Sequence, residues 1–179
     1  MLTLRPEVAR RLMNEMKKLK TAELGGISVK MDGDNLTEFH AVIQGPENTP
    51  FEGGEFQIKL EITDEYPQKP PKGYFMTKIF HPNVNEETGA ICLSTLSSDW
   101  TEDTGLDHLL LAIRCLLIQP NPESALNEEA GRLLLDGYDE FCNRAKLMTQ
   151  VHAMKTQQSA AAAPKKAAAN QTKKRLKRL

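Results

Sequence analysis

The chain has 179 residues, of which 40% are hydrophobic and 26% charged, which suits one domain of ordinary size and a short tail. No apolar run approaches the ~18 residues of a membrane helix, and the charged start of the chain is not that of a secretory signal. The three cysteines lie 23 and 27 residues apart, a pattern that fits neither a disulfide framework nor a zinc site. We expect a reduced protein of the cytoplasm or nucleus, with no membrane partner and no metal.

The charge is divided unequally along the chain. Residues 1–150 carry 15 basic and 24 acidic side chains, whereas residues 151–179 carry 8 basic and no acidic ones. Residues 155–179 are alanine-rich and lack a packing pattern, so we expect a flexible tail there and a folded domain over 1–154. A basic tail on an acidic body is typical of a segment that binds an acidic partner, nucleic acid or a membrane surface.

The first predicted element is a helix that begins near Pro6, a residue suited to a first turn, and ends within 21–26. Its apolar residues recur at spacings of four and three: Val8, Leu12, Met16 and Leu19. The cations Arg10, Arg11 and Lys17 lie largely off this apolar stripe. We expect them to contribute to partner binding.

A period of two then replaces the helical period and predicts four strands. The alternating segments are Ile27–Met31, Leu36–Gln44, Phe56–Ile62 and Tyr74–Ile79. Turn-forming residues at 32–35 and 45–54 separate the first three. Short connections between strands predict a four-stranded antiparallel meander.

Residues 80–104 show no periodicity, and a loop of that length in a compact domain is usually functional. Beyond it, Leu106–Ile118 is apolar on nearly every side, as expected of a helix that crosses the middle of a sheet. Two further helices are predicted over Ser124–Leu135 and from Tyr138 to about Met154. The order of elements indicates an α+β fold with helices covering one antiparallel sheet.

The long loop contains a reactive combination of residues, with Cys92 nine positions after Asn83. A thiolate is a good nucleophile near neutral pH, and a thioester keeps an acyl group reactive toward amines. The Asn83 amide would donate a hydrogen bond to the oxyanion as a lysine attacks. Cys115 and Cys142 fall within predicted helices, so we expect them to be small buried hydrophobes.

His81 offers an alternative, because a Cys–His pair would suit a hydrolase. No residue is evident that would orient such a base, and His81 directly before Pro82 fits a loop-packing role better. One histidine and one cysteine also fall short of the four ligands of a zinc site.

Together these motifs resemble the ubiquitin-conjugating enzymes in order and approximate spacing over residues 4–154. The resemblance is carried by Tyr66-Pro67-Gln68-Lys69-Pro70-Pro71, His81-Pro82-Asn83, Ile91-Cys92-Leu93, Trp100 and Pro120-Asn121-Pro122. It implies the ubiquitin-conjugating fold, with a long active-site loop and three helices after the sheet. The runs 70–75, 77–84 and 121–135 are similar to one subgroup, the S type. That subgroup elongates ubiquitin chains with the anaphase-promoting complex.

The resemblance implies a role for each matching residue. Cys92 would receive ubiquitin from the activating enzyme as a thioester, and Asn83 would support the catalytic loop or the oxyanion. Ser124 falls at the gate position beside the active site. Glu128 matches the acidic residue that presents the eleventh residue, a lysine, of an acceptor ubiquitin, although a carboxylate near a helix N-terminus also stabilises the helix dipole. ATP would be used by the activating enzyme, so no cofactor is expected.

The tail ends in a sequence similar to that of the S type, which implies docking on the multi-subunit ligase. The residues concerned are Leu176, Lys177, Arg178 and Leu179. Two positions that usually contact RING-type ligases differ from the family pattern, at Gln68 and at Thr101–Asp103, which leaves the tail as the better anchor. The interval from Asn83 to Cys92 is one residue longer than usual, and we expect the turn at 85–89 to absorb it.

Two other classes of function compete with the enzyme. A non-catalytic adaptor of the same fold would bind ubiquitin, but inactive variants typically lack the cysteine that this chain keeps. A nucleic-acid-binding protein would use the basic tail, but the body is acidic and the tail has no aromatic residue for base stacking. Residues 173–178 also suit a nuclear-localisation signal.

Overall fold

The computed structural model of the chain describes residues 4–30 and 35–154. The expected flexible tail lies outside these residues. The described part begins with helix α1 (Pro6–Thr21), as the apolar stripe predicts, with Pro6 in its first turn. The buried face of α1 consists of Val8, Leu12, Glu15 and Leu19.

Four strands follow and form one antiparallel sheet in the order β1-β2-β3-β4, which confirms the predicted meander. They are β1 (Ile27–Lys30), β2 (Glu38–Gln44), β3 (Glu55–Glu61) and β4 (Lys72–Phe75). The inner face of β3 buries Phe56, Ile58 and Leu60 at two-residue intervals, as a half-buried strand requires.

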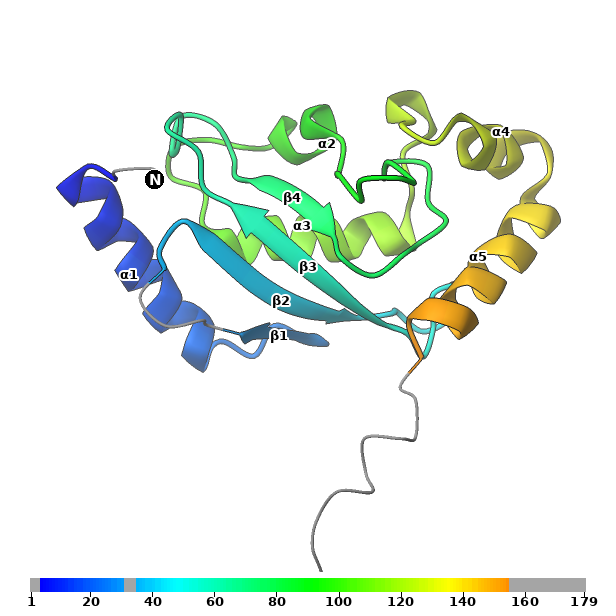
Figure 1. Cartoon of the computed structure of the whole chain (residues 1–179), viewed down its shortest axis with the longest axis horizontal. Helices are drawn as coiled ribbons and strands as arrows, with labels where there is room; N and C mark the ends of the chain where they lie inside the picture. The colour runs from blue at the N-terminus through cyan, green and yellow to red at the C-terminus, as the bar shows by residue number, and fades with distance from the viewer. Residues whose placement is uncertain (1–3, 31–34, 155–179) are drawn as a thin grey trace, which may run out of the picture.

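Helices cover the sheet and flank it (Figure 1). Helix α3 (Leu106–Ile118) crosses behind the sheet, α1 lies at one end, and α4 (Glu128–Asp136) and α5 (Tyr138–His152) lie at the other. One hydrophobic core joins sheet and helices, because α3 buries six of its residues against the inner face of the sheet. None of the helices within 4–30 and 35–154 is long and apolar enough to cross a membrane.

The structure differs from the predicted elements in three places. The loop over 80–104 contains a short helix, α2 (Leu93–Ser97). The fourth strand covers 72–75 rather than 74–79, and beyond it one backbone hydrogen bond to β3 remains, from the Met76 N–H to the Gln57 carbonyl. The helix expected from Ser124 is instead a 3-10 turn, η1 (Pro122–Ser124), followed by α4, which begins where the Asn127 side chain accepts a hydrogen bond from the Ala130 N–H.

The two cysteines outside the loop also differ in part from expectation. Both lie within helices, Cys115 on α3 and Cys142 on α5. Cys142 is half-buried, but Cys115 is exposed. The prediction of a buried hydrophobe at Cys115 is therefore wrong, because this position lies on the side of α3 that faces away from the sheet.

Candidate active site

Cys92 lies where the long loop meets the edge of the sheet and the start of α2. The residues before it pair with β4, since the Ile91 N–H donates to the Gly73 carbonyl at 2.9 Å and Ala90 bridges to Tyr74. Cys92 itself is the residue that precedes the first turn of α2, and its side chain is half-buried. The thiol is thus accessible but held between two ordered elements.

The turn at 85–89 is closed by its own side chains. The Asn85 carboxamide oxygen accepts hydrogen bonds from the Glu87 and Thr88 N–H groups at 3.0 and 2.8 Å. Gly89 adopts a φ of 73°, and a Cβ at this position would collide with the Phe75 carbonyl. The turn is therefore ordered, and its geometry fixes the approach of the chain to Cys92.

Asn83 is completely buried and holds the segment around η1 in place. Its side-chain nitrogen donates to the carbonyls of Asn121 at 2.6 Å and Ser124 at 3.1 Å, and its oxygen accepts from the Asn121 N–H at 2.9 Å. The Asn83 carbonyl accepts from the Cys92 N–H at 3.0 Å. Because both amide hydrogens are already used, Asn83 positions the loop here rather than pointing a free donor at the thiol.

His81 is buried and serves the same framework. Its Nε2 lies 2.9 Å from the Leu116 carbonyl, and its Nδ1 accepts from the Asn83 N–H at 3.1 Å. Burial lowers the pKa of His81 to about 4, against the smaller opposing effect of the Leu116 carbonyl. The imidazole is therefore neutral near pH 7 with both nitrogens occupied, which argues against a Cys–His hydrolase pair.

Two hydroxyl groups connect Cys92 to η1. The Cys92 Sγ lies 3.0 Å from the Ser94 Oγ, which donates to the Ser124 Oγ at 3.3 Å. Burial opposes ionisation of Cys92, but hydrogen bonding to Ser94 and Thr95 outweighs it, so the pKa of this thiol lies below its usual value. Ser124 was expected beside the active site, whereas Ser94 was not recognised because a serine two positions after a cysteine carries no signal by itself.

Glu128 occupies the first position of α4 and is exposed. The start of α4 is tied to the catalytic loop, because the N–H groups of Leu126 and Asn127 both donate to the Pro82 carbonyl, at 2.8 and 3.0 Å. The neighbouring Glu129 instead pairs with Arg144 of α5 at 2.6 Å. The structure thus fixes the position of Glu128 relative to the loop that carries Cys92.

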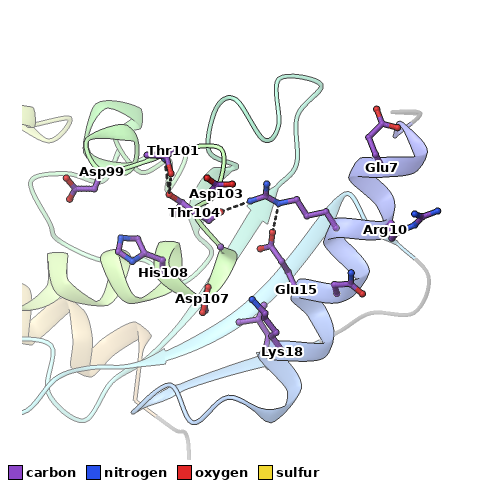
Figure 2. A pocket seen from close by; sticks show the side chains of 14 residues that line it. Glu7, Arg10, Glu15, Lys18, Asp99, Thr101, Asp103, Thr104, Asp107 and His108 are labelled. Atoms are coloured by element: carbon purple, nitrogen blue, oxygen red, sulfur yellow. Dashed lines mark hydrogen bonds and ion pairs between the residues drawn. The ribbon is translucent and has the colours of Figure 1, made fainter.

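The three expected partner-binding cations of α1 have different surroundings. Arg10 and Lys17 are exposed, and Figure 2 shows Arg10 on the outer side of the helix. Arg11 instead binds within the fold, with its Nε 2.8 Å from the Glu15 carboxylate and its guanidinium 2.9 Å from the Thr104 carbonyl. These contacts lie in a groove of about 930 Å³ between α1 and the segment before α3 (Figure 2).

Glu15 of α1 also binds α1 to the segment that precedes α3. Its buried carboxylate accepts hydrogen bonds from the Tyr66 hydroxyl at 2.8 Å and the Leu106 N–H at 2.7 Å, besides that from Arg11. Such a buried charge is tolerated because three donors, one of them the Arg11 cation, bind the carboxylate. The predicted tail residues Leu176, Lys177, Arg178 and Leu179 lie outside the described residues.

Comparison with known proteins agrees with this geometry. The family model described as ubiquitin-conjugating enzyme matches residues 11–149. The chain belongs to the ubiquitin-conjugating enzyme family. The resemblance of its motifs to that family is thereby confirmed, and so is the expected fold.

Relatives and solved structures extend this result. The chain is 50% identical over 157 residues to ubiquitin-conjugating enzyme E2 S of Branchiostoma floridae, covering 88% of this chain and 73% of that one. It is 51% identical over 150 residues to the protein of that name from Dictyostelium discoideum, covering 84% and 69%. A solved ubiquitin-conjugating enzyme from Plasmodium yoelii superposes with a TM-score of 0.76 at 33% identity, covering 87% of this chain and all of that one.

The protein is therefore a ubiquitin-conjugating enzyme whose sequence is similar to those of the E2 S proteins. As a member of this family it works with ubiquitin, a ubiquitin-activating enzyme and ubiquitin ligases. Among the described residues, no group of three or more His, Cys, Asp or Glu side chains has the arrangement of a metal site.

Proposed function

We propose that Cys92 carries ubiquitin as a thioester and transfers it to a lysine of another ubiquitin, elongating lysine-eleven-linked chains on substrates of the anaphase-promoting complex. The observation that supports this most directly is the position of Cys92, a half-buried thiol on an ordered loop, hydrogen-bonded to Ser94. Two further observations support the proposal: relatives about 50% identical are named E2 S, and the motifs of the sequence resemble the chain-elongating subgroup.

The chemistry requires two acyl transfers. In the first, the Cys92 thiolate attacks the thioester carbonyl carbon of ubiquitin held by the activating enzyme, a new C–S bond forms, and the activating enzyme's thiolate leaves. In the second, a lysine amine attacks the new thioester, the C–N bond forms, the C–S bond breaks, and the electron pair returns to the Cys92 sulfur. The amine loses its proton in this step.

Thioester formation is tested with ubiquitin, activating enzyme and ATP, followed by electrophoresis with and without reducing agent. We expect one adduct that the reducing agent removes. It is lost in Cys92→Ser, which would leave at most a stable oxyester, and is kept in Cys115→Ala and Cys142→Ala. A labile adduct of normal yield on Cys92→Ser would refute the assignment, and a parent protein that never charges would favour the non-catalytic adaptor.

Acceptor activation is assigned to Glu128, an exposed residue that directly follows the two residues whose N–H groups bind the catalytic loop at Pro82. Because charging needs no acceptor lysine, we expect Glu128→Ala to slow chain formation while charging and discharge to free lysine stay near normal. Glu129→Ala is the matched control, since it removes a carboxylate from the same turn of α4, one that points to Arg144. Equal slowing of chain formation and of discharge to free lysine would assign Glu128 to support of the loop.

Ligase docking is assigned to the tail, where Leu176 and Leu179 flank Lys177 and Arg178. Exposed charges are screened beyond ~8 Å at physiological salt, so specificity requires the two leucines to enter an apolar groove. We expect Leu176→Ala/Leu179→Ala to abolish ligase-dependent elongation and to leave thioester formation intact. Chain elongation at the parental rate on ligase-bound substrate would show that the tail binds through its charges alone and that the leucines do not contribute.

A further inference from the structure

The thiol of Cys92 and the hydroxyls of Ser94 and Ser124 form a continuous hydrogen-bonded row. The successive distances are 3.0 Å from Sγ to the Ser94 Oγ and 3.3 Å from there to the Ser124 Oγ. The two ends of the row are held separately. Ser94 belongs to α2, whereas the Ser124 carbonyl is fixed by the buried Asn83 amide at 3.1 Å. The row is thus set by the framework and not by one flexible loop.

Counting hydrogens shows that this row has two states. Each hydroxyl supplies one hydrogen and accepts through its lone pairs. With Cys92 as a thiol, Ser94 donates to Ser124, so the S–H donates to Ser94. With Cys92 as a thiolate, no S–H remains, and the Ser94 hydroxyl donates to the sulfur only if its hydrogen turns toward it. The Ser124 hydroxyl then donates to Ser94 in its place.

We propose that Ser94 and Ser124 form a hydroxyl relay that reverses direction when Cys92 ionises, with Ser94 acting directly on the reacting sulfur and Ser124 acting through Ser94. Ser94 is then a further catalytic residue, and Ser124 is a positioning residue. The same hydrogen bond serves both acyl transfers, because the Cys92 thiolate is the nucleophile of the first and the leaving group of the second. The inference rests on the proposed role of Cys92 as the ubiquitin carrier.

The charged groups on the segments around Cys92 do not supply this stabilisation. They are the exposed carboxylates of Glu86, Glu87, Asp99, Glu123 and Glu128, and the exposed ammonium of Lys72 on β4, the strand that pairs with the segment before Cys92. None of these charges is a cause of the lowered pKa of Cys92, which comes from hydrogen bonds. Carboxylates disfavour a nearby thiolate. His81, the histidine of this loop, is neutral and bonded to Leu116 and Asn83. Neutral hydrogen-bond donors are therefore the groups that favour the thiolate. The Ser94 hydroxyl contributes most to the lowered pKa of Cys92, and Thr95 and the backbone at the start of α2 add to it.

The experiment measures the alkylation rate of Cys92 by iodoacetamide against pH, using the full chain. Trypsin separates the three cysteines, because Arg114 and Arg132 lie between them, so mass spectrometry reports Cys92 alone. A hydrogen bond to a charged group has a net effect of ~1.5 kcal/mol or more. We therefore expect Ser94→Ala to slow alkylation about 10-fold at neutral pH and to leave the rate unchanged once the thiol is fully ionised.

Four further variants separate the relay from a structural effect. Ser98→Ala removes a hydroxyl from the end of the same short helix, one that is directed at the Thr95 carbonyl, and should not change the profile. Ser94→Thr keeps the hydroxyl and should restore it. Ser124→Ala should shift the profile in the same direction by a few-fold, and the double variant should be no slower than Ser94→Ala, since the second hydroxyl acts only through the first.

Single-turnover charging by the activating enzyme gives the second readout. The Ser94→Ala defect should be present at pH 7 and should vanish near pH 10, where thiolate formation is no longer limiting. An alkylation profile that Ser94→Ala leaves unchanged would overturn the proposal, and additive effects of the two substitutions would overturn the relay. Iodoacetamide reports the thiol without ubiquitin, so a protein that fails to charge at Cys92 would refute the proposed function and leave this measurement valid.

Discussion

Asn83→Ala distinguishes a framework role for this residue from a direct role in the chemistry. The substitution removes three side-chain hydrogen bonds, two to the Asn121 and Ser124 carbonyls and one from the Asn121 N–H. An unsatisfied buried polar group costs ~1–3 kcal/mol, but Asn121 and Ser124 are only half-buried, and water would restore part of the loss. We therefore expect a destabilisation of about 3 kcal/mol.

For a protein of this size, that loss corresponds to a fall in Tm of roughly 6–12 °C. The assay is thermal and urea unfolding of the uncharged protein, with Asn143→Ala as control, because Asn143 is exposed on α5. Charging of Cys92 should survive at a temperature well below the new Tm. Discharge to lysine should slow, since η1 carries Ser124 and is no longer held.

Asn83→Asp sharpens the comparison because it keeps the acceptor for the Asn121 N–H and loses the donor to both carbonyls. Asn83→Asp should also be destabilised. Its carboxylate would face the two carbonyl oxygens, so its Tm should be no higher than that of Asn83→Ala. A Tm change below ~2 °C in Asn83→Ala, combined with discharge slowed ~100-fold, would refute the framework argument. That result would return Asn83 to the role of oxyanion donor.

Three other predictions concern stability. The pKa of His81 is about 4 in the folded protein and near 6.5 in the unfolded chain, so the unfolded chain binds an extra proton between these pH values. The free energy of unfolding should therefore fall by up to about 3 kcal/mol as the pH drops from 6.5 to 4. Denaturant titrations at several pH values should show a smaller fall in His81→Gln. Gly89→Ala should cost at least ~2 kcal/mol and slow charging, since its Cβ meets the Phe75 carbonyl, and a Tm within 2 °C of the parent would contradict this. Tyr66→Phe should lower the urea midpoint by the equivalent of ~2 kcal/mol, since Glu15 loses one of its donors; an unchanged midpoint would show the bond to be neutral.

The fold was largely predictable from the sequence because its elements follow simple periods. Alternation over 38–44 and 55–61 specified the meander, and the apolar stripe of α1 specified the first helix. Helix α2 was missed for a physical reason. Five residues with three Ser or Thr among them show no helical period and little helix propensity, so this helix depends on its tertiary position.

The candidate site was predictable in its residues and less so in its contacts. Cys92, Asn83, Ser124 and Glu128 could be named from motifs, but the partners of the Asn83 amide lie 38 and 41 residues further along the chain. The bond from Ser94 to Ser124 likewise spans 30 residues. Such contacts depend on the packing of η1 against the loop, so no short sequence motif predicts them.

The pairing of residues 89–91 with β4 has a consequence beyond holding the thiol in place. The Phe75 N–H donates to the Gly89 carbonyl, and the Gly73 carbonyl accepts from Ile91. The segment that leads to Cys92 therefore covers an edge whose free backbone groups would otherwise invite strands from other molecules. A substitution that releases this segment would expose a template for intermolecular pairing as well as displace the nucleophile. Loss of activity and loss of solubility should consequently appear together in variants of this turn.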